Sequence, residues 1–296
     1  MDDEPTTEAV NPASADLDRL DTVELVRLIN REDATVAAAV AGQAEPIAAA
    51  IDCIAARLQA GGRLVYVGAG TSGRLGVLDA SEIPPTFSAG PEQVVGIIAG
   101  GDVALRNAVE GAEDSPETGA ADLDRLGFGP GDVLVGIAAS GSTPYVAGAM
   151  ARARDAGAAT IGVSCNRPAA IADLADIMIL PVVGPEVLAG STRMKAGTAT
   201  KMVLNMLSTG AMVRLGKTYG NLMVDLRASN RKLERRSLRL LMALTGLDRK
   251  AAVAVLDDCD GELKTAVVAT RLKVDATAAR ERLRAAHGRL RQVLGE

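Results

Sequence analysis

The stretch RLVYVGAGTSG (63–73) joins a short run of large aliphatic residues to a glycine turn. The aliphatic part, residues 63–68, has the length of a strand, and its nearly continuous apolar character is typical of a strand buried on both faces. The turn that follows, GAGTSG (68–73), stands where a strand would give way to a helix. The stretch therefore predicts the first strand–turn–helix unit of an α/β fold.

Four more apolar runs of strand length follow along the chain. They are VVGIIAG (94–100), DVLVGIAAS (132–140), ATIGVSC (159–165) and DIMILPVV (176–183). Most of the segments between them are long enough to hold a crossover helix. This alternation predicts an α/β fold with a doubly wound, mainly parallel five-stranded sheet.

Helical patterns flank the predicted sheet. Apolar residues recur at helical spacing in residues 44–58, and a second helical candidate, rich in Met, runs from Glu186 to Leu215. A stripe of this kind is usually core or subunit interface. Because the apolar residues of 193–215 cover more than one face, we expect a homodimer.

The strands stop near residue 235. The sequence from 240 to 273 reads as short helices broken at Gly246 and Gly261, and one last helix is expected over 275–293. Three parts of the chain are therefore predicted. They are a flexible tail (1–16), a catalytic α/β domain (17–234) and a small helical domain (235–296).

Composition excludes several classes of function. The chain has one His, no Trp, two Phe and three Tyr, so it cannot form a multi-His metal site and lacks an aromatic platform for nucleic-acid bases. Its net charge of −5 argues against nucleic-acid and anionic-membrane partners. The acidic start differs from a secretory signal, no run approaches the ~20 apolar residues of a membrane span, and the three cysteines show no paired spacing. We expect a cytoplasmic protein without metal, membrane or nucleic-acid partners.

The turn GAGTSG matches the glycine pattern of dinucleotide-binding folds by letter. The nearest acid, Asp102, lies farther from Gly73 than the ~20 residues typical of that fingerprint. Thr71 and Ser72 also place hydroxyls in the turn, where they can bind an anion themselves. The pattern therefore favours an anion other than a dinucleotide.

A second turn of this kind, ASGSTPYV (139–146), follows a later strand. Ser140, Ser142 and Thr143 surround its glycine, and Pro144 is suited to the first position of a helix. Ligands of open parallel sheets bind at the carboxyl ends of strands, where helix N-termini favour phosphate. Hydroxyls in such turns can also merely cap helices. Two equivalent turns without a Walker lysine favour a phosphate monoester.

A third hydroxyl-bearing stretch, GSTRMKAG (190–197), stands at the head of the Met-rich helical candidate. Ser191 could extend the anion site, together with the cations Arg193 and Lys195. The same residues could instead anchor a subunit interface. Both alternatives stay open from the residues alone.

Carboxylates remain as the candidates for acid–base chemistry. Glu82 is expected to end the first crossover helix, because Pro84 and Pro85 follow it. The negative end of a helix disfavours an ionised carboxylate and raises its pKa, which suits a general acid. Glu113 is expected at the margin of an apolar helix face in residues 100–115, as the half-buried acid of its cluster.

Four runs of this chain together resemble the N-acetylmuramic acid 6-phosphate etherase family of the sugar isomerase (SIS) domain superfamily. They are GAGTSGRLGVLDASEIPPTF (68–87), AGGDVALRNAVEGAEDS (99–115), GIAASGSTPYV (136–146) and GSTRMKAGTATKMVLNMLSTG (190–210). The similarity runs in order from about residue 12 to the C-terminus and includes NLMVDL (221–226) and Lys264. It implies an SIS fold with a ubiquitin-associated-like helical end.

The resemblance also implies a reaction. A member of this family cleaves the D-lactyl ether of N-acetylmuramate 6-phosphate, giving N-acetylglucosamine 6-phosphate and D-lactate, and requires no cofactor. Glu82 is then the acid that protonates the leaving oxygen, and Glu113 is the base at sugar C2. A homodimer with active sites near the interface is implied as well. The alternatives are a phosphosugar isomerase, which usually needs a His, and a non-catalytic sugar-phosphate sensor.

Overall fold

The computed structural model describes residues 5–225 and 231–296, without the side chain of Lys232. The chain divides into two compact units. The first, here called the sheet unit, comprises Met1–Ser81 and Glu92–Ser208; the second, the helical unit, comprises Glu82–Pro91 and Thr209–Glu296. The helical unit thus begins earlier in the chain than the boundary predicted at 234–235.

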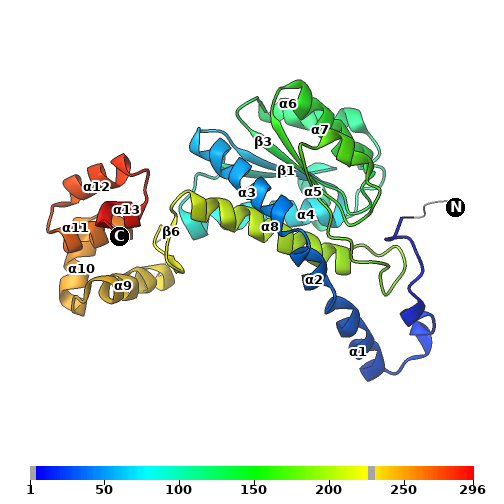
Figure 1. Cartoon of the computed structure of the whole chain (residues 1–296), viewed down its shortest axis with the longest axis horizontal. Helices are drawn as coiled ribbons and strands as arrows, with labels where there is room; N and C mark the ends of the chain where they lie inside the picture. The colour runs from blue at the N-terminus through cyan, green and yellow to red at the C-terminus, as the bar shows by residue number, and fades with distance from the viewer. Residues whose placement is uncertain (1–4, 226–230) are drawn as a thin grey trace. The chain divides into compact units, whose positions relative to one another are not determined.

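Five parallel strands form the centre of the sheet unit (Figure 1). They are β1 (Leu64–Gly68), β2 (Val94–Ile98), β3 (Val133–Ile137), β4 (Ala159–Val163) and β5 (Ile177–Ile179), in the order β2-β1-β3-β4-β5. Every residue of β1 and β3 is buried. The predicted doubly wound parallel sheet is confirmed, because the apolar runs are covered by helices on both faces.

Helices pack on the sheet according to the alternation of side chains along the strands. Val65 of β1 lies in a buried cluster with residues of α6 and α7. Tyr66, the next residue, points to the opposite face and bonds to α4. The helices of this unit are α1 (Thr22–Asp33), α2 (Val36–Ala41), α3 (Ala44–Gln59), α4 (Gly70–Phe87), α5 (Gly101–Arg106), α6 (Pro116–Leu126), α7 (Pro144–Asp155) and α8 (Lys195–Arg214), of which α4 and α8 extend into the helical unit.

The predicted helix at 44–58 is confirmed as α3, whereas the candidate over Glu186–Leu215 begins late. Residues 186–194 form turns, and α8 starts only at Lys195. The buried carboxylate of Glu186 accepts hydrogen bonds from the backbone N–H groups of Lys195 and Ala196, at 2.9 Å each. Since these are orphan donors of a helix start, Glu186 caps α8 from outside it.

A flexible tail was expected over residues 1–16. Residues 1–4 lie outside the described residues, whereas residues 5–16 pack on the sheet unit. Thr7 is fully buried, and Asn11 is 5% exposed. The Asn11 amide donates to Glu32 Oε2 at 2.9 Å, and Glu32 in turn pairs with the buried Lys195 at 2.8 Å. These polar contacts anchor the segment, which its hydrophilic composition did not indicate.

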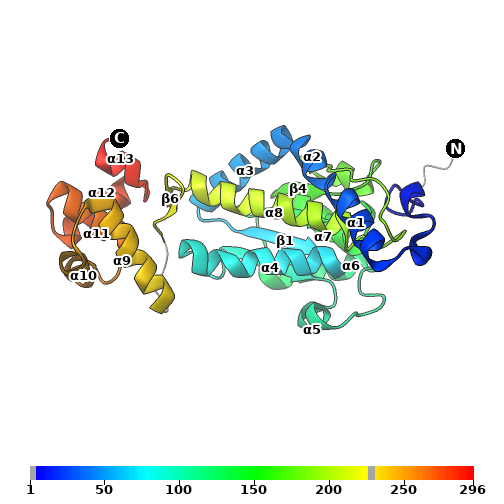
Figure 2. The ribbon, with the colours of Figure 1, turned by 90° about the horizontal axis from the view of Figure 1, so that it is seen from below.

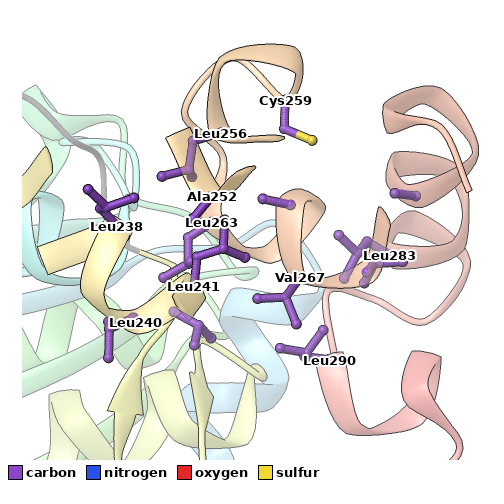
Figure 3. Packing of buried hydrophobic residues seen from close by; sticks show 14 of the residues in the cluster. Leu238, Leu240, Leu241, Ala252, Leu256, Cys259, Leu263, Val267, Leu283 and Leu290 are labelled. Atoms are coloured by element: carbon purple, nitrogen blue, oxygen red, sulfur yellow. The ribbon is translucent and has the colours of Figure 1, made fainter. Parts of the chain in front are cut away.

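Buried leucines such as Leu241, Leu263 and Leu290 form the core of the rest of the helical unit (Figure 3). The described residues there form a short hairpin and five helices. They are β6 (Thr218–Tyr219), β7 (Leu222–Met223), α9 (Arg231–Thr245), α10 (Arg249–Asp258), α11 (Leu263–Leu272), α12 (Ala276–Ala285) and α13 (Leu290–Leu294). The breaks predicted at Gly246 and Gly261 are confirmed, and both glycines have positive φ. The single helix predicted over 275–293 is wrong, because Gly288 adopts φ +75° and separates α12 from α13.

Lys264 connects the parts of the helical unit. Its Nζ donates to the carbonyls of Gly216 and Gly288 at 2.9 Å and to Asp225 Oδ2 at 3.0 Å. Burial lowers the pKa of Lys264, while Asp225 opposes this shift. With three donors and three acceptors, the ammonium is fully satisfied. Lys264, one of the residues that carry the family resemblance, therefore has a structural role in the helical unit.

Residues 5–225 and 231–296 include several helices rich in apolar side chains. Among these described residues, no single helix is long and apolar enough to cross a membrane; Thr22–Ala41 and Ala44–Gln59 reach that length and apolar composition only together, as a pair bent by 62°.

Candidate active site

The sheet order places the two hydroxyl-rich turns beside each other. β1 and β3 are neighbours, with Gly68 opposite Ile137 at their carboxyl ends. β1 pairs with β2 on its other side, so the order of the strands reverses at the β1–β3 pair. Ligands of doubly wound sheets bind at such a switch point. The turn after β1 and the turn after β3 both open there.

The first turn holds Thr71 and Ser72 in the opening turn of α4. Both side chains are half-buried. The turn is tight, because a Cβ added to Gly73 would lie 2.6 Å from the Gly68 carbonyl oxygen. The glycine pattern of this turn is therefore explained by close packing of strand and helix. The beginning of α8 is nearby, since a Cβ on Gly197 would lie 3.4 Å from Thr71 Cγ2.

The second turn presents three hydroxyls before α7. Ser142 is exposed, Ser140 and Thr143 are half-buried, and the hydroxyl groups of Ser140 and Ser142 lie 3.4 Å apart. Thr143 occupies the N-cap position of α7 but makes no side-chain capping bond. Capping of α7 by this hydroxyl therefore does not explain the turn, and its side chain stays available to a ligand.

Ser191 lies half-buried in the turns before α8. Of the two cations near it, Lys195 is 3% exposed and paired with Glu32, while Arg193 is exposed. The charge of Lys195 is balanced by Glu32, which also accepts a hydrogen bond from Asn11. Lys195 therefore helps to anchor the N-terminal segment. Arg193 is left on the surface beside Ser191.

Glu113 lies next to the second turn, but not on the helix predicted for it. α5 ends at Arg106, and residues 107–115 form turns in which Glu113 is exposed. The helix stops at Asn107, which adopts an extended conformation with φ −122° and ψ 146°. Val109 then folds back over Gly100, 3.1 Å from the position of an added Cβ. The predicted half-buried helix position was therefore wrong. Instead, the Tyr145 N–H donates to the Glu113 carbonyl oxygen at 3.0 Å and ties Glu113 to the start of α7.

Glu82 lies inside α4, because the helix continues through Pro84 and Pro85 to Phe87. The prediction that the prolines end the helix at Glu82 was wrong, so Glu82 does not lie at the negative end of the helix as expected. Pro84 and Pro85 have no backbone N–H, so two helical hydrogen bonds are missing in the last turn. The burial of Ile83 and Phe87 stabilises that turn instead. Glu82 is exposed and belongs to the segment Glu82–Pro91 of the helical unit. The sheet unit therefore brings together Glu113 and the hydroxyl turns without Glu82.

A buried polar network lies three residues before Glu82 along α4. Asp79 accepts hydrogen bonds from Tyr66 Oη at 3.0 Å, Asn205 Nδ2 at 2.8 Å and Ser208 Oγ at 3.1 Å, which join α4 to β1 and α8 (Figure 2). Burial raises the pKa of Asp79, and the three donors oppose that shift. An acid in the middle of an otherwise apolar helix face is the sequence signal that could have indicated this network.

The helical unit has a cavity of its own. Its volume is about 1170 Å³, and none of the residues predicted for the active site lines it. Four exposed arginines on its wall, Arg231, Arg235, Arg249 and Arg284, make it polar. Its size alone does not identify an active site, since the hydroxyl turns and Glu113 lie elsewhere.

Comparisons with known proteins show the fold and the family of the chain. A family model of the glucokinase regulatory protein N-terminal SIS domain matches residues 46–154. A solved structure of a phosphoheptose isomerase from Francisella tularensis is similar, with a TM-score of 0.52 and 19% sequence identity over 66% of this chain and 100% of that one. At this identity the likeness shows the fold alone, which is the SIS fold expected from the sequence.

Sequence relatives cover nearly the whole chain. The N-acetylmuramic acid 6-phosphate etherase of Rhodopirellula baltica is 58% identical over 98% of this chain and 96% of its own length. The protein of the same name from Rubrobacter xylanophilus is also 58% identical, over 99% of this chain and 97% of its own length. From the fold and this similarity, the chain belongs to the N-acetylmuramic acid 6-phosphate etherase family.

Proposed function

We propose that this chain is a lyase that cleaves the D-lactyl ether of N-acetylmuramate 6-phosphate, in the recycling of cell-wall sugars. The observation that carries the proposal is the bond from the Tyr145 N–H to the Glu113 carbonyl. It places a carboxylate-bearing residue at the turn that holds Ser140, Ser142 and Thr143. A phosphate anchor and a base beside it are what proton removal from a sugar phosphate requires.

The reaction proceeds through the open-chain sugar, because only an aldehyde at C1 makes the C2 proton acidic. Glu113 takes this proton, the electron pair forms the C2=C3 double bond, and the C3–O bond breaks. The lactate oxygen leaves with a proton from Glu82. Water then adds across the double bond, with its hydroxyl at C3, and gives N-acetylglucosamine 6-phosphate. Both steps are acid–base chemistry, which this mechanism completes without a cofactor.

The phosphate is assigned to hydroxyls of three segments. Ser72 and Thr71 follow β1, Ser140, Ser142 and Thr143 follow β3, and Ser191 precedes α8. Helix N-termini favour anions, and α4 and α7 both begin at this end of the sheet. The first-turn amides of α8 are already occupied by Glu186, so Ser191 is expected to act through its hydroxyl.

The position of Glu82 supports a homodimer with shared active sites. Ser72 and Glu82 lie on one helix, ten positions apart, which corresponds to ~15 Å along its axis. A sugar phosphate anchored at the first turn of α4 spans less than this distance between its phosphorus and C3. We therefore expect Glu82 to act in the site of a second copy. The cytoplasmic location inferred from the sequence stays a prediction.

A test of the function is incubation of the purified chain with N-acetylmuramate 6-phosphate. We expect D-lactate and N-acetylglucosamine 6-phosphate in equal amounts. A ketose phosphate product would indicate an isomerase, and saturable binding without turnover would indicate a sensor. Either result would refute the proposed lyase.

Replacement of Ser142 by Ala tests the phosphate site. We expect a loss of ~1–3 kcal/mol of substrate binding, measured as an increased KM, because a hydroxyl bonded to a charged group is removed. The thermal midpoint should hardly change, since Ser142 is exposed and its contact with Ser140, at 3.4 Å, is long for a hydrogen bond. The control is Asp275→Ala, which removes the N-cap of α12 and should lower stability without raising KM. An unaltered KM in Ser142→Ala would contradict the assignment.

A further inference from the structure

The N-terminal segment is bonded to a buried asparagine behind the second hydroxyl turn. The backbone N–H of Thr7 donates to Asn166 Oδ1 at 3.1 Å, and Asn166 Nδ2 donates back to Thr7 Oγ1 at 2.8 Å. Thr6 Oγ1 donates to Asn166 Oδ1 at 2.6 Å. Thr7 is fully buried and Asn166 is 1% exposed. The two residues therefore form a reciprocal pair inside the sheet unit.

Asn166 uses its remaining donor on the turn itself. Its Nδ2 also donates to the carbonyl oxygen of Ser140 at 3.1 Å. Its backbone N–H donates to Ser164 Oγ at 3.1 Å, and Ser164 Oγ donates to the Ala139 carbonyl at 3.3 Å. The side-chain amide thus makes two donated and two accepted bonds, which is its full capacity. Such a saturated, buried amide holds its neighbours in one geometry.

Thr7 extends the connection to the third hydroxyl segment. The backbone N–H of Gly190 donates to the Thr7 carbonyl oxygen at 3.2 Å. Gly190 has φ +75°, and a Cβ there would lie 3.2 Å from Glu8 Oε2, so the two stretches of chain are in close contact. The start of the described chain runs beside the loop before α8 (Figure 1). Thr7 therefore lies between the Ser140 turn and Ser191.

We propose that Thr7 and Asn166 are positioning residues that hold the Ser140–Thr143 turn and the Gly190–Ser191 turn at the separation needed to bind a phosphate monoester. This rests on the proposed function only in assigning phosphate to these turns. A loose N-terminal tail would need none of these buried bonds. The unliganded protein keeps the two turns in place through them, so less ordering is needed when the anion binds.

The test is titration of the full chain with inorganic phosphate by calorimetry. Thr7→Val keeps the volume but removes the acceptor of Asn166 Nδ2, and we expect its Kd for phosphate to rise by ~10-fold. Thr7→Ser keeps the hydroxyl and should restore binding close to the wild-type value. KM for the phosphorylated substrate should rise in parallel in Thr7→Val, with a smaller change in kcat.

The matched control is Thr160→Val. Thr160 is also fully buried, and its hydroxyl donates to the Leu174 carbonyl at 2.8 Å. It lies near the amino end of β4, whereas Asn166 follows the carboxyl end of that strand. We expect a similar loss of thermal stability in Thr160→Val and Thr7→Val but an unchanged Kd for phosphate in Thr160→Val.

The outcomes separate the two proposals. Equal Kd values in Thr7→Val and Thr160→Val would show that Thr7 only anchors the segment and would overturn the positioning role. Absence of phosphate binding by the wild-type chain would overturn it too. If the wild type binds phosphate in a Thr7-dependent manner but releases no lactate, the positioning role stands and the proposed lyase activity fails.

Discussion

Glu113→Ala is expected to lose both exchange of the C2 hydrogen and release of lactate, whereas Glu82→Ala loses only lactate release. Proton removal at C2 needs the base alone, because the resulting carbanion is stabilised as an enolate by the C1 aldehyde. Ether cleavage needs the acid as well, since lactate is a poor leaving group until its oxygen is protonated. The rate of C2 exchange in Glu113→Ala and the rate of lactate release in Glu82→Ala should each fall by at least ~10²-fold, the range for a general acid or base.

One proton-NMR time course in D₂O for each variant distinguishes the two roles. The C2 signal of the substrate should disappear in Glu82→Ala without formation of lactate, and it should persist in Glu113→Ala. Glu110→Ala is the matched control, because Glu110 is an exposed acid in the same turn segment as Glu113. Continued exchange in Glu113→Ala would refute the assignment of the base. Loss of exchange in a folded, substrate-binding Glu82→Ala would place Glu82 at an earlier step.

A mixture of the inactive Glu82→Ala and Glu113→Ala chains is expected to regain about one quarter of the wild-type activity after subunit exchange. Half of the dimers are then mixed, and in each of them one of two sites combines an intact Glu113 with an intact Glu82 from the partner. The expectation follows from the ~15 Å of helix between Ser72 and Glu82, which prevents both from serving one sugar phosphate in one chain.

The measurement is lactate release by the mixture, with light scattering to verify that each variant and the mixture have the mass of two chains. Mixing Glu113→Ala with Ser142→Ala is the control. Both residues are expected to belong to the same chain's part of the site, so no site in a mixed dimer has both of them intact. This mixture should therefore release no more lactate than the Ser142→Ala chains that it contains. A mixture of Glu82→Ala and Glu113→Ala that stays inactive although mixed dimers form would place Glu82 in the site of its own chain.

The strands and the hydroxyl turns could be predicted because each depends on a short stretch of sequence. Val and Ile runs such as residues 63–68 mark a strand buried on both faces wherever they occur. A hydroxyl- and glycine-rich turn directly after such a strand must lie at the carboxyl end of the sheet. Local patterns were therefore enough to predict the hydroxyl residues Thr71, Ser72, Ser140, Ser142 and Thr143. The parallel sheet places their two turns beside each other, because β1 and β3 are neighbours.

Local rules failed where packing between distant segments competes with helix propensity. The prolines after Glu82 do not end α4, because Ile83 and Phe87 are buried and hold the following turn. The pattern around Glu113 has helical spacing, but Val109 packs over Gly100 and turns the chain instead. In both cases tertiary contacts outweigh a local preference, which for a proline inside a helix is as large as ~3 kcal/mol. The two glutamates were selected by helix-end and helix-face arguments and again by the family resemblance, but their environments differ from those that the helix arguments predicted.

The sequence by itself determined the sheet, its helical coverage, the hydroxyl turns and membership in the family, since aliphatic runs and unbroken motifs specify these within a few residues. Only the tertiary structure decided that Thr7 and Asn166, 159 positions apart, form one buried pair behind the Ser140 turn. Polar bonds between remote segments follow no periodicity, and a threonine in a hydrophilic N-terminal stretch has the same local signature whether buried or solvated. Its burial depends on the chain that folds over it.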